Sequence, residues 1–175
     1  MSINAVPEKS INFSVYYEGR DMLGSADGEL PKLEAMTEEV KGAGVAGAFD
    51  SVTLGHFSST SLTLNWRNVT NDFVKLAAHK AHDLELYAAH QDYDAALGIY
   101  IPRQIAVFVR VIPKVSDIGK LAVAAMSDTS TELEVLYLKL DIDGKERIEV
   151  DKLNYIFKVD GVDYLAGVRV ALGKL

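Results

Sequence analysis

Apolar and polar residues alternate along several stretches of this chain, which is the pattern of a β-strand with one buried face. The clearest stretch runs from Ser59 to Trp66, where Leu62, Leu64 and Trp66 fall on one face. Three other stretches alternate in the same way, with apolar positions at Ile11, Phe13 and Val15, at Leu84, Leu86 and Ala88, and at Ile105, Val107, Val109 and Val111. The last of these strands is expected to end near Pro113. The pattern predicts a mainly antiparallel β protein.

Two segments have the spacing of a short helix instead. Thr70 is a candidate N-cap, and Phe73, Leu76 and Ala77 repeat at helical spacing up to about His79. At the C-terminus, either Asp160 or Asp163 can cap a helix that Gly173 ends. Its apolar stripe would be Val162, Leu165, Val168 and Leu172, with Leu165 and Val168 expected in the core.

The fold class that follows is mainly β (α+β). We expect an antiparallel β-sandwich or barrel-type protomer with one internal short helix and a C-terminal helix. A chain of 175 residues suits one domain, so residues 1–175 are expected to form a single unit.

Glycines divide the first third of the chain. Residues 19–28 are predicted to be a turn or loop, and residues 30–41 one long strand with Pro31 near its start, where a missing N–H is tolerated. Residues 42–47 are glycine-rich but too apolar for a typical flexible linker. We therefore hypothesise that this loop packs on a neighbouring subunit through Gly42, Gly44, Val45 and Gly47.

The region around residues 113–144 leaves two alternatives open. Residues 115–130 fit either a loop with a helical turn or the ragged end of a hairpin. In residues 131–142 the apolar positions change parity, from Leu133 and Val135 to the even-numbered positions from Leu136 onward. Either a β-bulge near Leu136 resets the register, or the two halves bury opposite faces against different neighbours. The following Asp143-Gly144 is typical of a tight hairpin turn.

Composition narrows the function classes. Lys and Arg total 18 against 25 Asp and Glu, for a net charge of −7, which argues against an ordinary DNA-coating protein. The absence of cysteine excludes disulfides, zinc–thiolate sites and thiol chemistry. The N-terminal sequence lacks the apolar segment of a signal peptide, and no apolar run is long enough to span a bilayer, so we expect no membrane insertion.

Three motifs invite a chemical interpretation, and each has a simpler one. Asp141-Ile-Asp-Gly-Lys lacks the glycine and glutamate positions of a calcium-binding EF-hand and fits a hairpin. His79 and His82 are three apart but fall on different predicted elements, and no third ligand has a suitable spacing. The glycines at 42, 44 and 47 match a dinucleotide fingerprint without the strand and helix that it needs. We therefore expect no catalytic, cofactor-binding or metal-binding residues, and a protein that is not an enzyme.

The C-terminal segment carries a resemblance to a known family. Its pieces are Tyr137-x-Lys-Leu-x-x-Asp-Gly, then Glu149-Val-Asp followed by Asn154, then Val159-Asp-Gly-Val-Asp-x-Leu-Ala-Gly-Val-Arg. Together with Leu30-Pro-Lys-Leu and the order of predicted elements, they resemble the major tail-tube proteins of contractile-tailed phages and R-type tailocins. The resemblance covers most of the chain and is most specific over residues 135–172, with departures at Lys152 and over residues 113–130.

This resemblance implies a structural role. Tail-tube protomers form hexameric rings that stack into a hollow tube, and each protomer adds strands to one β-barrel shared between subunits. The implied partners are further copies of the chain, the tail sheath protein, and the baseplate and tail-terminator proteins. DNA (phage) or ions (tailocin) would pass through without sequence-specific binding, and the acidic balance would keep DNA phosphates from adhering to the bore. The implied location is the virion tail or tailocin particle, assembled in the bacterial host cytoplasm.

The alternative from another class is a small soluble β-barrel that binds a ligand. Such a module would present convergent aromatic or polar groups in a pocket and would stay small in solution. A tube protein would instead assemble as its concentration rises.

Overall fold

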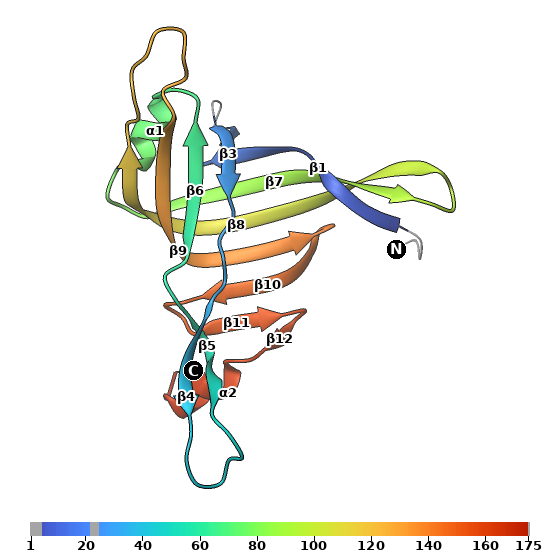
Figure 1. Ribbon diagram of the computed structural model, residues 1–175, viewed down its shortest axis with the longest axis vertical. Helices are drawn as coiled ribbons and strands as arrows, with labels where there is room; N and C mark the ends of the chain where they lie inside the picture. The colour runs from blue at the N-terminus through green and yellow to red at the C-terminus, as the bar shows by residue number, and fades with distance from the viewer. Residues whose placement is uncertain (1–4, 22–24, 175) are drawn as a thin grey trace.

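The computed structural model describes residues 5–21 and 25–174, and most of them lie in one antiparallel sheet (Figure 1). The main path of this sheet has the order β12-β11-β10-β9-β8-β7-β1-β2. The bounds of these strands are β1 Ala5–Tyr17, β2 Arg20–Asp21, β7 His82–Asp94, β8 Ile99–Asp117, β9 Thr129–Ile142, β10 Lys145–Asp151, β11 Ile156–Val159 and β12 Val162–Asp163. The mainly β prediction is therefore confirmed.

A second layer crosses one face of this sheet. It consists of β3 (Ser25–Glu29), β6 (Ser61–Trp66) and the first half of β9, with the helix α1 (Asn71–Leu76) at its upper end in Figure 1. The core lies between the two layers, and the predicted apolar face of β6 is fully enclosed there: Leu62 and Leu64 are 0% exposed and Trp66 is 1% exposed. The opposite side of the core comes from β1, β7, β8 and the second half of β9, with Val15, Leu84, Leu86, Val107, Val109, Val111 and Leu138, while Leu133 and Val135 lie on the first half of β9.

Strand β9 belongs to both layers because it contains a β-bulge at Leu136. Arg110 of β8 is opposite Tyr137, whereas the next residue, Val111, is opposite Val135, so Leu136 is the extra residue. Before the bulge β9 pairs with β6, and after it β9 pairs with β10. The bulge alternative is therefore correct. The parity change in the sequence marks the place where the strand changes its neighbour.

The two predicted helices have different outcomes. The Thr70 cap is confirmed, since its side-chain oxygen accepts a hydrogen bond of 3.1 Å from the Phe73 N–H, and Phe73 and Leu76 are buried. At the C-terminus, α2 spans only Ala166–Ala171, and no side chain caps its start. Gly173 does end it, with a positive φ of 68° and an N–H bonded to the Val170 carbonyl.

The apolar stripe expected for the terminal helix is wrong. No residue within α2 is buried, and both Val162 and Leu172 are more than half exposed. Only Leu165, which precedes the helix, is buried. The segment is too short to cover a face of the sheet, so the described part of the protomer leaves most of its apolar side chains unburied.

Several predicted boundaries also need correction. The described part of the segment 19–28 contains β2 and β3, with residues 22–24 outside the described residues, and only Ala35–Val40 of the segment 30–41 is a strand. Strand β8 continues past Pro113 to Asp117. Its pairing with β7 stops at Val111, opposite His82, so the missing N–H of Pro113 interrupts no hydrogen bond between these two strands. Residues 118–128 form a projecting loop between β8 and β9. Of the two alternatives, a loop with a helical turn or the ragged end of a hairpin, the second is closer to this structure.

The Asp-Gly pairs at 143–144 and 160–161 form tight turns between antiparallel strands. Asp143 and Gly144 have φ values of 52° and 74°, which suit the primed hairpin turn predicted between β9 and β10. Asp160 and Gly161, at 48° and 83°, connect β11 to β12 in the same way. Within residues 5–21 and 25–174, neither helix has the length and apolar character needed to cross a bilayer.

Candidate assembly interfaces

A long two-stranded hairpin leaves the body of the protein and ends in the glycine-rich loop. Among the described strands, β4 (Ala35–Val40) and β5 (Phe49–Phe57) pair only with each other. Gly42, Gly44, Val45 and Gly47 all lie at the tip, at the lower end of Figure 1, where Gly42 and Gly44 have φ values of 131° and 98°. The structure thus brings the four predicted interface residues together at the most distant point of the hairpin.

The hairpin carries many apolar side chains that no other described segment covers. Those of Met36, Val40, Val45, Phe49, Val52 and Leu54 are all exposed. An isolated two-stranded hairpin is marginally stable in water, and a large exposed apolar patch is typical of an interaction site. Two ion pairs at 2.7 Å, Lys32–Glu34 and Lys41–Glu39, lie at opposite ends of β4 and are themselves exposed. The hairpin is therefore suited to lie against another molecule.

The base of the hairpin is fixed by the C-terminal segment. Gly55 has a φ of 64°, and a Cβ built on it would lie 2.6 Å from the Cδ1 and Cγ atoms of Leu165, so the absent side chain makes room for this leucine. The Phe57 and Phe157 rings meet edge to face, with centroids 5.1 Å apart. Leu165 is 2% exposed. This joint was not foreseen, because a glycine within a strand carries no sign of the side chain that fills its space.

The face of the main sheet that points away from the core is polar and acidic. Cross-strand pairing places on it the acidic residues Asp83, Glu85, Asp141, Glu149, Asp151 and Asp163, and the basic residues Arg110, Lys139 and Lys158. The basic side chains are all engaged: Arg110 binds Asp83 at 2.8 Å, Lys139 lies 3.4 Å from Asp141 and Lys158 binds Glu149 at 2.6 Å. The carboxylates are in excess, so this face carries net negative charge.

Aromatic side chains form a row across the same face. Tyr16, Tyr87 and Phe108 contact one another edge to face, with centroids 5.6 and 5.9 Å apart, and Lys139 Nζ lies 4.3 Å from the Phe108 ring centre. Partial burial, together with the nearby Glu149 carboxylate, raises the pKa of the Tyr137 hydroxyl to about 12. The Tyr137 hydroxyl therefore stays neutral, and the negative charge of the face comes from its carboxylates.

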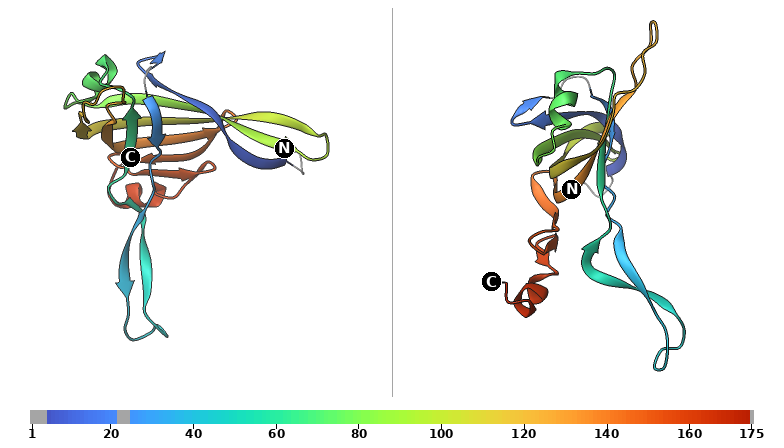
Figure 2. Two further views of the ribbon diagram at one scale, coloured as in Figure 1. Left: turned by 45° about the horizontal axis from the view of Figure 1, so that its top comes forward. Right: turned by 90° about the vertical axis from the view of Figure 1, so that its left-hand side faces the viewer.

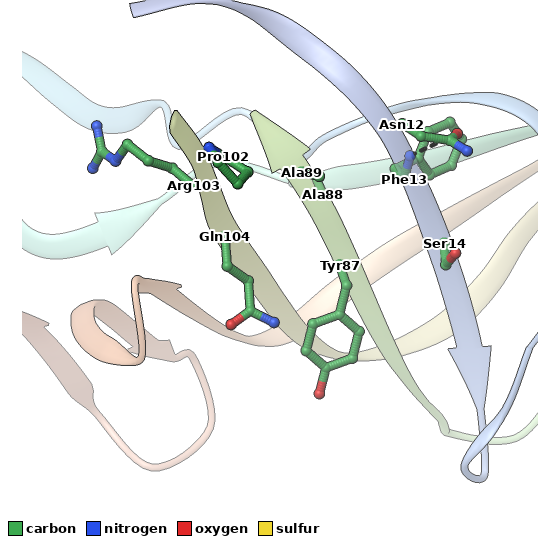
Figure 3. Close-up of a pocket in the computed structure, with 9 residues that line it drawn as sticks. All are labelled: Asn12, Phe13, Ser14, Tyr87, Ala88, Ala89, Pro102, Arg103 and Gln104. Atoms are coloured by element: carbon green, nitrogen blue, oxygen red, sulfur yellow. Dashed lines mark hydrogen bonds between the residues drawn. The ribbon is translucent and has the colours of Figure 1, made fainter. Parts of the chain in front are cut away.

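A shallow hollow of about 370 Å³ lies where β1, β7 and β8 meet (Figure 3). The residues that line it include the small residues Ala88, Ala89 and Pro102, and Tyr87 and Gln104 project to the same side. Arg103 is occupied by Asp92 and Asp143, each at 3.2 Å. The hollow therefore offers no free charged group of the kind that fixes a small ligand.

The two histidines considered as metal ligands, His79 and His82, and the nearby His90 have different surroundings. The buried His82 ring bonds to the Ala78 carbonyl at 2.9 Å and to the Tyr17 hydroxyl at 3.3 Å, while His79 is exposed and His90 lies 3.3 Å from Ser10 Oγ. Among the residues that the structure describes, no three histidine or acidic side chains are grouped so as to hold a metal ion. The glycine fingerprint lies at a hairpin tip, without the helix that would bind a phosphate.

Comparisons with known proteins all match tail-tube proteins or a tube terminator. The family model of phage tail tube protein FII matches residues 7–173. The tail tube protein of Escherichia phage P2 is 27% identical over 176 residues, covering 97% of this chain and 99% of that protein. Among solved structures, the PVC sheath/tube terminator of an extracellular contractile injection system, in its extended state, matches with a TM-score of 0.53 and 13% identity over 77% of this chain and 96% of that chain. At this identity, the structural match shows a shared fold.

Proposed function

This chain belongs to the phage tail tube protein FII family, and we propose that its copies close into hexameric rings that stack into the inner tube of a contractile tail or tailocin. Its role is structural, within a contractile-tail tube, and the small ligand-binding module is not favoured. It functions as a virion tail component, and we place its assembly in the host cytoplasm. In this proposal, residues 1–175 act as one tail-tube domain without catalysis or a cofactor.

The open edges of the main sheet carry this proposal. At one end of the sheet, β1 pairs with β2 only at Tyr16 and Tyr17, so its edge from Ala5 to Val15 has no pairing partner among the residues that the structure describes. At the other end, β12 is only two residues long. Long unprotected strand edges promote aggregation in a monomer, and pairing them between copies in a closed ring removes this liability.

The acidic face of the sheet then lines the bore. The core occupies the other face, beneath β6 and α1, so a closed barrel turns the polar face inward. Excess carboxylates along the bore repel DNA phosphates, and DNA or ions pass without a sequence-specific contact. The second layer faces outward, where the tail sheath protein would lie. The baseplate and tail-terminator proteins would meet the two ends of the stack.

The hairpin tip supplies a subunit interface in this arrangement. We propose that Gly42, Gly44, Val45 and Gly47 pack against a neighbouring copy. Val45 is 39% exposed in the protomer, and an aspartate in its place would be soluble there but costly to bury without a partner, by about 1–3 kcal/mol or more per subunit. Since every subunit of the tube repeats this cost, assembly responds steeply to it.

Electron microscopy of the purified protein at increasing concentration tests the proposal. The parent chain is expected to form rings and tubes, whereas Val45→Asp is expected to keep its melting temperature and remain unassembled. Val74→Asp is the matched control, because it places the same charge at an exposed apolar residue on α1, far from the hairpin. A parent chain that stays monomeric at every concentration contradicts ring formation. Normal tubes from Val45→Asp would show that the tip is free in solvent.

A further inference from the structure

We propose that the loop of residues 118–128 in one protomer packs against the β4–β5 hairpin of the neighbouring protomer in the same ring. The inference rests on the proposed function and goes beyond it by naming the surface that receives the hairpin. It identifies the partner as a second copy of this chain.

The loop is the most solvent-exposed apolar segment among the described residues. Leu121 is 98% exposed and Val123 is 100% exposed, and both Ile118 and Met126 are more than half exposed. The tip, residues 121–126, contains no charged or polar side chain. A fully exposed leucine and valine on an uncharged tip have no role within the protomer and are typical of a contact that is completed elsewhere.

The foot of the loop, formed by Lys120, Ser127 and Asp128, is held in place by hydrogen bonds and an ion pair, so the tip has a defined position. The Lys120 N–H bonds to the Ser127 carbonyl at 2.8 Å, and Lys120 pairs with Asp128 at 2.6 Å. The Ser127 N–H bonds to the carbonyl of Arg67, at the end of β6, at 3.0 Å. A pre-ordered loop loses less conformational entropy when it binds, which favours a specific contact.

The loop and the hairpin continue the same layer of the protein in opposite directions. Strand β6 runs from Ser61, next to the base of the hairpin, to Trp66, next to the foot of the loop, and β9 leads directly out of the loop alongside it. The two projections therefore lie at the two ends of the long axis in Figure 1, and the right-hand view of Figure 2 places both on the same side of the main sheet.

This axis is also the direction in which a ring would close. In Figure 1 the strands of the main sheet follow one another along the axis, from β1 and β7 near the loop to β11 and β12 near the hairpin. Pairing of the sheet edges therefore places copies one after another along that axis. A head-to-tail contact of this type uses two different surfaces and makes a closed ring when its rotation closes. The hairpin of each copy then meets the loop of the next.

The chemistry of the two surfaces is complementary. Both are apolar, so their contact removes hydrocarbon from water on each side. On the hairpin, the exposed Glu38 and Asp50 form no ion pair with any described residue. Beside the foot of the loop, the exposed Arg67 likewise has no ion-pair partner among the described residues. These opposite charges, at the edge of the apolar contact, favour the packing of the loop against the hairpin and its orientation.

Cysteine crosslinking tests the contact cleanly, because the chain has no cysteine of its own. Val123→Cys is combined with either Val45→Cys at the hairpin tip or Val52→Cys along β5. Assembled tubes are then treated with an oxidant or with a short bis-maleimide, since a disulfide forms only when the Cα atoms come within about 7 Å. The single-cysteine variants, assembled and treated identically, are the controls.

The expected result is a covalent ladder that ends at a closed ring of six subunits in denaturing electrophoresis, seen with at least one of the two double variants. A ladder that continues beyond the ring places the contact between rings and overturns the proposal. Tubes that form normally without specific crosslinks also overturn it, while leaving the tube function intact. A parent chain that forms no tubes counts against the proposed function itself, so the two failures are distinguishable.

Discussion

The joint between the hairpin and the C-terminal segment predicts a strong and specific effect of Gly55→Ala. Gly55 lies on β5 with a φ of 64°, and its missing Cβ leaves the space that Leu165 fills. The added methyl group would lie 2.6 Å from two atoms of that leucine. Since the glycine backbone belongs to the hairpin, the leucine is the group that is expected to move.

The size of the effect has two parts. An alanine held in the left-handed region costs about 1–2 kcal/mol. Expelling the Leu165 side chain, which is 2% exposed, forfeits a further contribution of about 1.5–3 kcal/mol. Leu165 lies outside the main core cluster, so the combined loss of about 2.5–5 kcal/mol should fall on docking of the C-terminal segment and only weakly on the central sheet.

Hydrogen exchange measures this docking directly. The Tyr164 N–H bonds to the Phe157 carbonyl at 2.9 Å, and the Leu165 N–H bonds to Asp163 Oδ1 at 3.0 Å, so both amides should lose protection in Gly55→Ala. Leu64→Ala is the contrasting control, because it removes a fully buried side chain from the main cluster and should destabilise the whole sheet by about 2–5 kcal/mol.

A double-mutant cycle isolates the contact between the two residues. Leu165→Ala alone should weaken docking by about 2–5 kcal/mol. In that background the clash is gone, and Gly55→Ala should add only the backbone strain of about 1–2 kcal/mol. Strictly additive costs, or unchanged exchange at Tyr164 and Leu165 in the glycine variant, would refute the reasoning.

Two further predictions concern local contacts. Thr70→Ala should lower the unfolding free energy by about 1 kcal/mol, because the Phe73 N–H loses its 3.1 Å acceptor, and Thr70→Ser should recover most of it in thermal melts. Hydrogen bonds from Arg169 hold the pKa of Asp163 below its ordinary value, so their support of the C-terminal segment is present above the ordinary pKa of about 4 and lost as pH falls through the lowered value. The amide resonance of Leu165 should follow this titration, and Asp163→Asn should make it flat; a parent amide that does not respond contradicts the assignment.

Much of the fold could be predicted because its signals are local. The alternation of Leu62, Leu64 and Trp66 identified a buried strand face, since side chains of a strand point to opposite sides whatever the strand meets. Asp143-Gly144 identified a turn, because the two residues adopt positive φ with little strain. The Thr70 cap could be predicted for the same reason, because its side chain accepts a hydrogen bond from an N–H only three residues along the chain.

The candidate interfaces could be predicted only in part. The glycine-rich loop stood out by its composition, and the structure places it at the hairpin tip. The sequence left two alternatives for the structure of the segment that contains residues 118–128. The run of uncharged residues around Val123 was nevertheless a signal that this loop has an apolar partner. The terminal stripe was misassigned, because helical spacing says which residues share a face and not whether anything covers that face.

The sequence by itself thus determined which residues alternate, which turn and which cap, because backbone preferences and side-chain periodicity act over a few neighbouring residues. It also revealed that β9 changes parity at Leu136. Only the tertiary structure decided that this change transfers the strand from β6 to β10, and that Leu165 fills the space above Gly55. Those contacts join residues far apart in the chain, and their energies depend on the three-dimensional packing of both partners.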